Sequence, residues 1–146
     1  MAEAIMQITG LNDDTLQVGD ALPAFETEPI SRLSLALYCG ASGDHNPIHV
    51  DTDFARAAGQ KDVFAHGMLS MAYLARLLTN WVPQAAVREF GVRFVAITQV
   101  GDRIRCRATV VDKHTVDGER RARLVLETVD QNGQVKLAGD AVVALS

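Results

Sequence analysis

The sequence predicts an α+β domain in which a curved antiparallel sheet wraps around one long helix. The stretch from Gly67 to about Asn80 is apolar on nearly its whole circumference, as expected of a helix that is buried on most sides. After Pro83 the apolar residues recur with a period of two, which is typical of strands with one apolar face. Glycine-containing turns separate these strands, so we expect them to pair in chain order as an antiparallel meander.

The first elements expected are one short strand and one short helix. Alternating apolar and polar residues indicate a strand over Ala24–Glu28. Ser31 can cap a helix that runs from Arg32 to about Cys39, and Gly40 and Gly43 should end it.

A loop then separates this helix from the long one. Residues 42–49 contain too many turn-forming residues to predict a helix or a strand. Asp51 and its neighbours can cap a short helix over Phe54–Ala58, which Gly59 should stop. The long helix follows, and Gly67 is its first residue.

Four strands are expected in the second half of the chain, at Phe90–Ile97, Arg103–Val111, Arg121–Val129 and Val135–Leu145. The turn sequences between them are Val100-Gly101-Asp102, Asp117-Gly118 and Asn132-Gly133. Such a sheet has edge strands that need protection, and joining two sheets edge to edge is one way to provide it. We therefore expect a homodimer or a multiple of dimers, with residues of two subunits around one cleft.

Length and composition favour a single domain, residues 1–146, and argue against several kinds of partner. The net charge of −4 argues mildly against nucleic acid. The longest apolar stretch, Met68 to Val82, contains Arg76 and is shorter than the ~20 residues of a membrane span. The acidic start, Met1 to Ala4, is unlike a signal peptide, and Cys39 and Cys106 are expected to be reduced thiols. We therefore expect a cytoplasmic protein with no membrane partner.

The residues Asp44, His49 and Gly67 suggest proton-transfer chemistry. Adding water to a carbon–carbon double bond needs a base for the water and an acid for the carbon, which an aspartate and a histidine can supply together. A backbone N–H at a helix N-terminus can stabilise the negative charge that develops on a thioester oxygen. By itself, however, an aspartate that follows a glycine in a loop is more often a turn residue or a cap.

The complete pattern resembles a known family. Gly43-Asp44-x-Asn46-Pro47-x-His49, followed by Ala65-His66-Gly67-Met68, resembles the hydratase motif of MaoC-like hot-dog proteins, which are (R)-specific enoyl-CoA hydratases and (3R)-hydroxyacyl thioester dehydratases. Residues 65–81 with Val92-Arg93-Phe94 are most similar to the catalytic subunits of bacterial fatty-acid dehydratases. The resemblance covers about residues 16–145 and implies a hot-dog fold.

The resemblance also implies a reaction and three catalytic residues. Asp44 and His49 would be the catalytic pair, and the N–H of Gly67 would help to form the oxyanion hole. The implied function is the reversible hydration of trans-2-enoyl thioesters to (3R)-3-hydroxyacyl thioesters in fatty-acid metabolism. No metal and no separate cofactor are expected, because coenzyme A or the phosphopantetheine of an acyl carrier protein would arrive as part of the substrate.

Four further residues are candidates for substrate binding, and most have plainer interpretations. Asn46 precedes a proline, a position typical of a turn residue, so a turn role is expected for it. His66 is expected mainly to hold the loop before the helix. Met68 follows the catalytic glycine in the motif. Arg93 should lie on the strand face opposite Phe90 and could bind phosphates, although an ion pair with a neighbouring carboxylate is the alternative.

Three other functions stay open. The chain could be the catalytic subunit of a heteromeric hydroxyacyl-carrier-protein dehydratase, or a non-catalytic subunit that binds acyl thioesters, although such subunits usually lack the Asp–His pair. A hot-dog thioesterase would use a carboxylate on or beside the central helix, and residues 67–82 contain none. The chain also departs from some family members, because Ala75 stands where they have a hydroxyl, which Ser70 or Tyr73 could replace.

Overall fold

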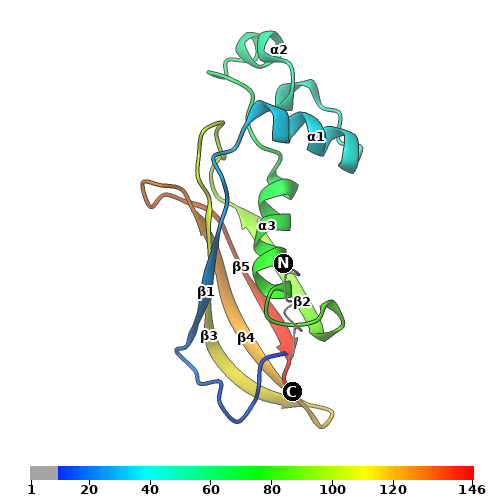
Figure 1. The fold of residues 1–146 in the computed structure, drawn as a ribbon, viewed down its shortest axis with the longest axis vertical. Coiled ribbons are helices and arrows are strands. Elements are labelled where there is room, and N and C mark those ends of the chain that lie inside the picture. The colour runs from blue at the N-terminus through cyan, green and yellow to red at the C-terminus, as the bar shows by residue number, and fades with distance from the viewer. Residues whose placement is uncertain (1–9) are drawn as a thin grey trace, which may run out of the picture.

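The computed structural model describes residues 10–146, so the acidic start at Met1 to Ala4 lies outside the described residues. A five-stranded antiparallel sheet curves along one side of the long helix α3 (Gly67–Thr79), and two shorter helices lie beyond the N-terminal end of α3 (Figure 1). The predicted α+β architecture is confirmed.

The first strand and the first helix lie close to their predicted places. Strand β1 (Ala21–Glu26) begins three residues earlier than expected. Helix α1 (Arg32–Ser42) begins with a capping box, in which the Ser31 side chain accepts from the Ser34 N–H. The prediction that Gly40 ends this helix is wrong. The helix continues through Gly40 and ends at Gly43, whose φ of 75° is the left-handed conformation that glycine adopts at low cost.

The loop after α1 contains a helical turn that the sequence did not predict. Pro47–His49 form a single 3-10 turn, η1, because the Asn46 side chain accepts from the Ile48 N–H and so caps it. Helix α2 (Thr52–Ala57) follows and is capped by the Asp51 carboxylate, as expected, although it begins two residues before the predicted start at Phe54.

The long helix α3 is buried less completely than its composition predicts. Its buried residues are Leu69, Ser70, Leu74, Leu77 and Leu78. Met68 and Ala72 are exposed, so one apolar side of α3 has no cover within a single chain. The helix ends at Thr79, close to the expected Asn80.

The strands of the second half are β2 (Val87–Phe94), β3 (Arg105–Val116), β4 (Glu119–Val129) and β5 (Val135–Ala144), and the sheet order is β1-β3-β4-β5-β2. The predicted meander is correct for β3 to β5 and wrong for β2, which pairs with β5 instead of β3. The reason lies in the connections. The two-residue turn at Asp117 and Gly118 has φ of 50° and 82° and closes a tight hairpin, whereas residues 95–104 form a long segment that lets β2 cross to the other edge.

The core lies between α3 and the concave face of the sheet. The inward-facing residues predicted for β3 and β4 are all buried: Ile104, Cys106, Ala108, Val110, Ala122, Leu124 and Leu126. Both cysteines are free and buried. Within the described chain, no helix is long and apolar enough to cross a membrane.

Candidate active site

The Asp44 loop is held by hydrogen bonds between its own residues. The Asp44 N–H donates to the Ser42 hydroxyl at 3.1 Å, and the Asp44 carboxylate accepts from the Asn46 N–H at 3.2 Å. The Asn46 side chain caps η1, so its turn role is the one the structure shows. The Asp44 side chain remains exposed, although the backbone that carries it is well fixed.

His49 is held in one ring orientation and one tautomer. Its Nδ1 lies 2.7 Å from the Phe64 carbonyl oxygen. Because a carbonyl oxygen only accepts, Nδ1 carries the proton of the neutral ring, which leaves the lone pair on Nε2. His49 is therefore prepared to accept a proton from a water molecule beside Nε2.

His66 lies behind this pair. It is 1% exposed, its ring stacks on His49 with centroids 3.9 Å apart, and the Tyr38 ring contacts it edge-on. Its Nε2 lies 3.3 Å from both the Asp44 carbonyl oxygen and the Cys39 thiol. Burial lowers the pKa of His66, so the ring is neutral at ordinary pH. These contacts give His66 the expected structural role, and the cavity beside Asp44 does not include it.

The three side chains converge on one place. A carboxylate oxygen of Asp44 and one ring nitrogen each of His49 and His66 all lie within 4.8 Å of one another. Burial first, and then the charge of Asp44, raise the pKa of the Cys39 thiol, so this neighbour is a neutral thiol and no nucleophile. An acid and a base can thus share one water molecule here.

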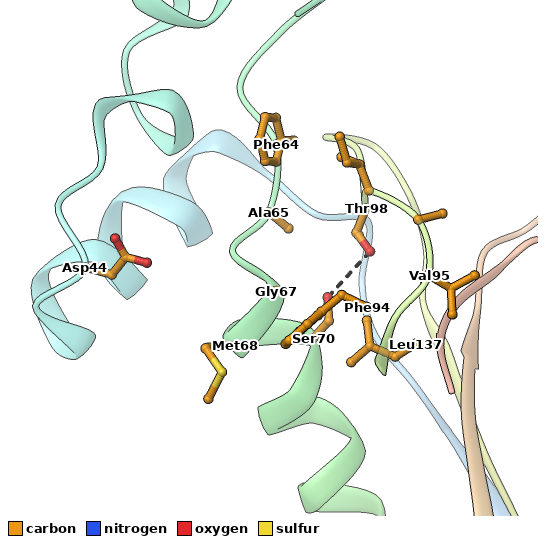
Figure 2. Close-up of a pocket in the computed structure, with 12 residues that line it drawn as sticks. Asp44, Phe64, Ala65, Gly67, Met68, Ser70, Phe94, Val95, Thr98 and Leu137 are labelled. Carbon is orange, nitrogen blue, oxygen red and sulfur yellow. Dashed lines mark hydrogen bonds between the residues drawn. The ribbon is translucent and has the colours of Figure 1, made fainter. Parts of the chain in front are cut away.

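A cavity of about 500 Å³ opens beside Asp44, between the start of α3 and residues 94–98. Figure 2 shows Asp44 on one side of it and Phe94, Val95, Thr98 and Leu137 on the other. The lining is mostly apolar, as an acyl chain would require. Gly67 and Met68 of α3 both line this cavity, so these two predicted residues lie in one site with Asp44.

The absence of a side chain at Gly67 leaves room for the Phe94 ring. A Cβ at Gly67 would lie 2.6 Å from the Phe94 ring, so this ring occupies the space that a side chain would take. The glycine therefore lets Phe94 pack directly onto the helix start. The N–H groups of Gly67 and Met68, the first two of α3, have no hydrogen-bond partner among the described residues, and no side chain caps them. Both residues line this end of the cavity.

Four of the predicted residues do not line this cavity. Asn46, His49 and His66 lie in or beside the Asp44 loop, whereas Arg93 lies on the sheet. It is exposed and lines a separate hollow with Val125 and Asp140, on the face of the sheet that points away from α3. The alternative prediction, an ion pair with a carboxylate, is not found among residues 10–146. Within one chain, Arg93 therefore does not reach the cavity.

The wall formed by residues 95–98 does not follow from the sequence pattern. The predicted strand extends to Ile97, but the N–H groups of Val95 and Ala96 both donate to the Lys136 carbonyl, so the regular ladder of β2 ends at Phe94. Lys136 is buried between Asp102 and Asp130 and helps to hold this region, but this contact depends on tertiary structure and gives no local signal in the sequence.

Several known proteins are similar to this chain in sequence. The family described as MaoC like domain matches residues 15–132. An (R)-specific enoyl-CoA hydratase of Rhodospirillum rubrum is 30% identical over 116 residues, which are 78% of this chain and 78% of that protein. The 3-hydroxyacyl-thioester dehydratase Z of Mycobacterium tuberculosis is 31% identical over 115 residues, 75% of this chain and 76% of that one.

Solved structures share the architecture. The R-hydratase PhaJ1 from Pseudomonas aeruginosa superposes with a TM-score of 0.82 over 94% of this chain and 87% of that chain, at 26% identity. A protein described as a MaoC-like dehydratase gives a TM-score of 0.84 at 31% identity, over 94% of this chain and 43% of that chain. The protein therefore belongs to the MaoC-like dehydratase family and has its hot-dog fold.

Proposed function

We propose that the protein catalyses the reversible hydration of trans-2-enoyl thioesters to (3R)-3-hydroxyacyl thioesters in fatty-acid metabolism. One observation carries this proposal. The Asp44 carboxylate and the His49 ring meet within 4.8 Å, with Nε2 of His49 free to accept a proton, beside an apolar cavity that also borders the start of α3.

The reaction follows from these positions. A water molecule between Asp44 and His49 gives a proton to the pair as its oxygen adds to C3 of the enoyl group. The electron pair of the double bond moves toward C1, and negative charge accumulates on the thioester oxygen. The free N–H of Gly67, at the positive end of the α3 dipole, stabilises this charge until the pair returns a proton to C2.

The proposed substrate is a thioester of coenzyme A or of an acyl carrier protein, and the proposed assembly is a homodimer or a multiple of dimers. Strand β2 is a free edge of the sheet, and Met68, Phe94 and Val95 are exposed apolar residues beside the cavity. A second copy at this edge would cover them and complete the cavity wall. Arg93, on β2, is proposed to meet the phosphates of the carrier in that assembly. A cytoplasmic location stays a prediction.

The alternative functions differ in whether they need the Asp44–His49 pair. A non-catalytic thioester-binding subunit would need no Asp–His pair with a free ring nitrogen, so the geometry favours a catalytic chain. A catalytic subunit of a heteromeric dehydratase would use the same residues, and only its assembly would differ. A thioesterase would need a carboxylate on α3, and Gly67–Thr79 has none.

A substrate screen with the purified protein tests the proposal. Crotonyl-, octenoyl-, dodecenoyl- and aromatic enoyl-CoA would be followed by loss of the enoyl absorbance, with and without a chelator, since no metal is expected. A coupled (S)-specific 3-hydroxyacyl-CoA dehydrogenase should give no signal. Thioester hydrolysis without hydration, or an (S) product, would refute the proposal.

A further inference from the structure

Two buried hydroxyl groups lie in the cavity wall without adequate hydrogen-bond partners. Ser70 on α3 and Thr98 in the facing segment are 1% and 4% exposed, and both line the cavity. Figure 2 shows their side chains pointing at one another, with the oxygens 3.5 Å apart. This distance is long for a hydrogen bond between hydroxyls, and neither oxygen has another partner among the described residues.

Such a pair calls for a ligand. A hydroxyl group has one hydrogen to donate and two lone pairs, so most of the capacity of Ser70 and Thr98 is unused. Polar groups that are removed from water without compensation are unfavourable, and native structures rarely keep them unless they serve a purpose. Because both hydroxyls line the cavity, a group that enters it can supply the remaining partner.

The position of Ser70 indicates which part of the substrate it meets. Ser70 follows Gly67 by three residues, so the two lie on the same face of α3, and helical side chains lean toward the N-terminus. The Ser70 hydroxyl therefore lies toward the unsatisfied N–H groups at the start of the helix. Both kinds of donor border the same cavity.

We propose that the Ser70 hydroxyl is a second hydrogen-bond donor to the thioester carbonyl oxygen, beside the Gly67 N–H, and that Thr98 orients it. This assignment rests on the proposed hydratase function. In the free protein the Ser70 hydroxyl points to Thr98. When the thioester binds, the Ser70 hydrogen turns to the carbonyl oxygen, and the Ser70 oxygen accepts from Thr98 instead. The proton stays on Ser70 throughout.

The segment that carries Thr98 is rigid enough for this role. The Thr98 carbonyl accepts from the Ala65 N–H at 2.9 Å, which ties the segment to the residues before α3. On its other side, the Lys136 ammonium donates to the Ile97 carbonyl at 2.9 Å. Lys136 is itself buried 3.4 Å from Asp102 and 3.3 Å from Asp130. Donors fixed before the substrate arrives need no reorganisation during the reaction, which is what oxyanion stabilisation requires.

The first test measures kcat and KM of single variants. The substrate is the shortest trans-2-enoyl-CoA that the wild type hydrates. Ser70→Ala should lower kcat roughly 100-fold with little change in KM, because one donor to the developing oxyanion is lost. Thr98→Val should lower kcat by a smaller factor, and Thr98→Ser, which keeps the hydroxyl, should restore it. A kcat of Ser70→Ala within twofold of the wild type would overturn the proposal.

Infrared spectroscopy separates a direct contact from a structural effect. The same enoyl-CoA, with ¹³C at the thioester carbonyl, would be bound to Asp44→Asn, which holds the substrate without converting it. The carbonyl stretch should lie below its solution frequency, and Ser70→Ala added to Asp44→Asn should move it part of the way back. An unchanged frequency overturns the Ser70 assignment while the hydratase function stands, whereas a wild type inactive on every enoyl-CoA refutes both.

Discussion

The imidazole ring of His49 stacks on that of His66, with centroids 3.9 Å apart and an angle of 26° between the planes. The same His66 ring contacts the backbone carbonyl of Asp44 through Nε2. One buried, neutral histidine thus touches both members of the proposed catalytic pair. His66 therefore links the backbone of the exposed Asp44 to the ring of the buried His49.

The catalytic pair is tested first. Asp44→Asn and His49→Ala should each reduce hydration by roughly two or more orders of magnitude, the scale of losing an acid or a base. Both variants should keep the circular dichroism of the wild type. His45→Ala is the matched control, because His45 is exposed in the same loop and should leave turnover unchanged. Wild-type turnover in a folded Asp44→Asn or His49→Ala would exclude the assignment.

Acid should destabilise the protein through His66. Burial lowers the pKa of His66 below its ordinary 6.5, so below that value the unfolded chain binds more protons than the folded one. The stability contributed by the neutral ring is complete above pH 6.5 and is lost as the pH falls through 6.5 toward the lower folded pKa. Urea unfolding at about pH 5 and about pH 8 should show this difference. It should shrink in His66→Gln and persist in His45→Gln, and an equal slope in all three proteins would contradict it.

The pairing of β2 with β5 depends on a glycine. A Cβ at Gly139 would lie 2.0 Å from the Gly91 carbonyl oxygen and 2.9 Å from the Cα of Val92, which are backbone atoms that cannot move aside. Gly139→Ala should therefore cost roughly 1–3 kcal/mol of unfolding free energy, the usual cost of overpacking. A Cβ at Gly91, directly beside it, meets nothing within 4 Å, so Gly91→Ala is the control. Similar unfolding midpoints in urea for the two variants would argue against this steric account.

Assembly can be measured directly. Light scattering on the eluting protein should give a mass of twice the 15.8 kDa chain or an even multiple of it. The physical reason is the free edge of β2 together with exposed apolar residues beside the cavity, which water does not favour. A fully active monomer at low concentration would exclude the shared cavity.

Arg93 should affect binding of the carrier and not the chemistry. Arg93→Ala should raise KM for an enoyl-CoA and scarcely change KM for a short pantetheine analogue without the nucleotide, because only the first brings nucleotide phosphates. Arg123→Ala is a useful control, since Arg123 already pairs with Asp140 on the same face of the sheet. Equal effects on both substrates, or no effect on either, would remove Arg93 from the site.

Local patterns predicted most of the fold. The alternation in β3 and β4 is set by which face each residue must bury, and the predicted faces are correct. The apolar composition of α3 predicts the helix itself but overestimates its burial, because Met68 and Ala72 are exposed. The place of β2 was not predictable in this way, because its partner, β5, is about fifty residues away in the chain and nothing in residues 87–94 identifies it.

In the candidate site, too, residues that are close in the sequence could be predicted, and those brought together by tertiary structure could not. Asp44 and His49 were found because the residues that make their loop are neighbours in the sequence. The facing hydroxyls of Ser70 and Thr98 were not paired, since they are 28 residues apart and meet only after the 95–98 segment folds over the helix start. The support of Asp44 by His66 depends equally on tertiary structure.

The strand order also has a consequence for synthesis of the chain. The two edge strands, β1 and β2, are both made before the three strands that separate them, and β2 pairs with β5, the last of the five strands in chain order. Pairings between such distant segments slow folding. A nascent chain thus carries Asp44, His49 and Gly67 well before the sheet can close beside them. The strand Val135–Ala144 contributes neither member of the proposed catalytic pair, yet it supplies Leu137 to the cavity wall and the edge on which β2 pairs.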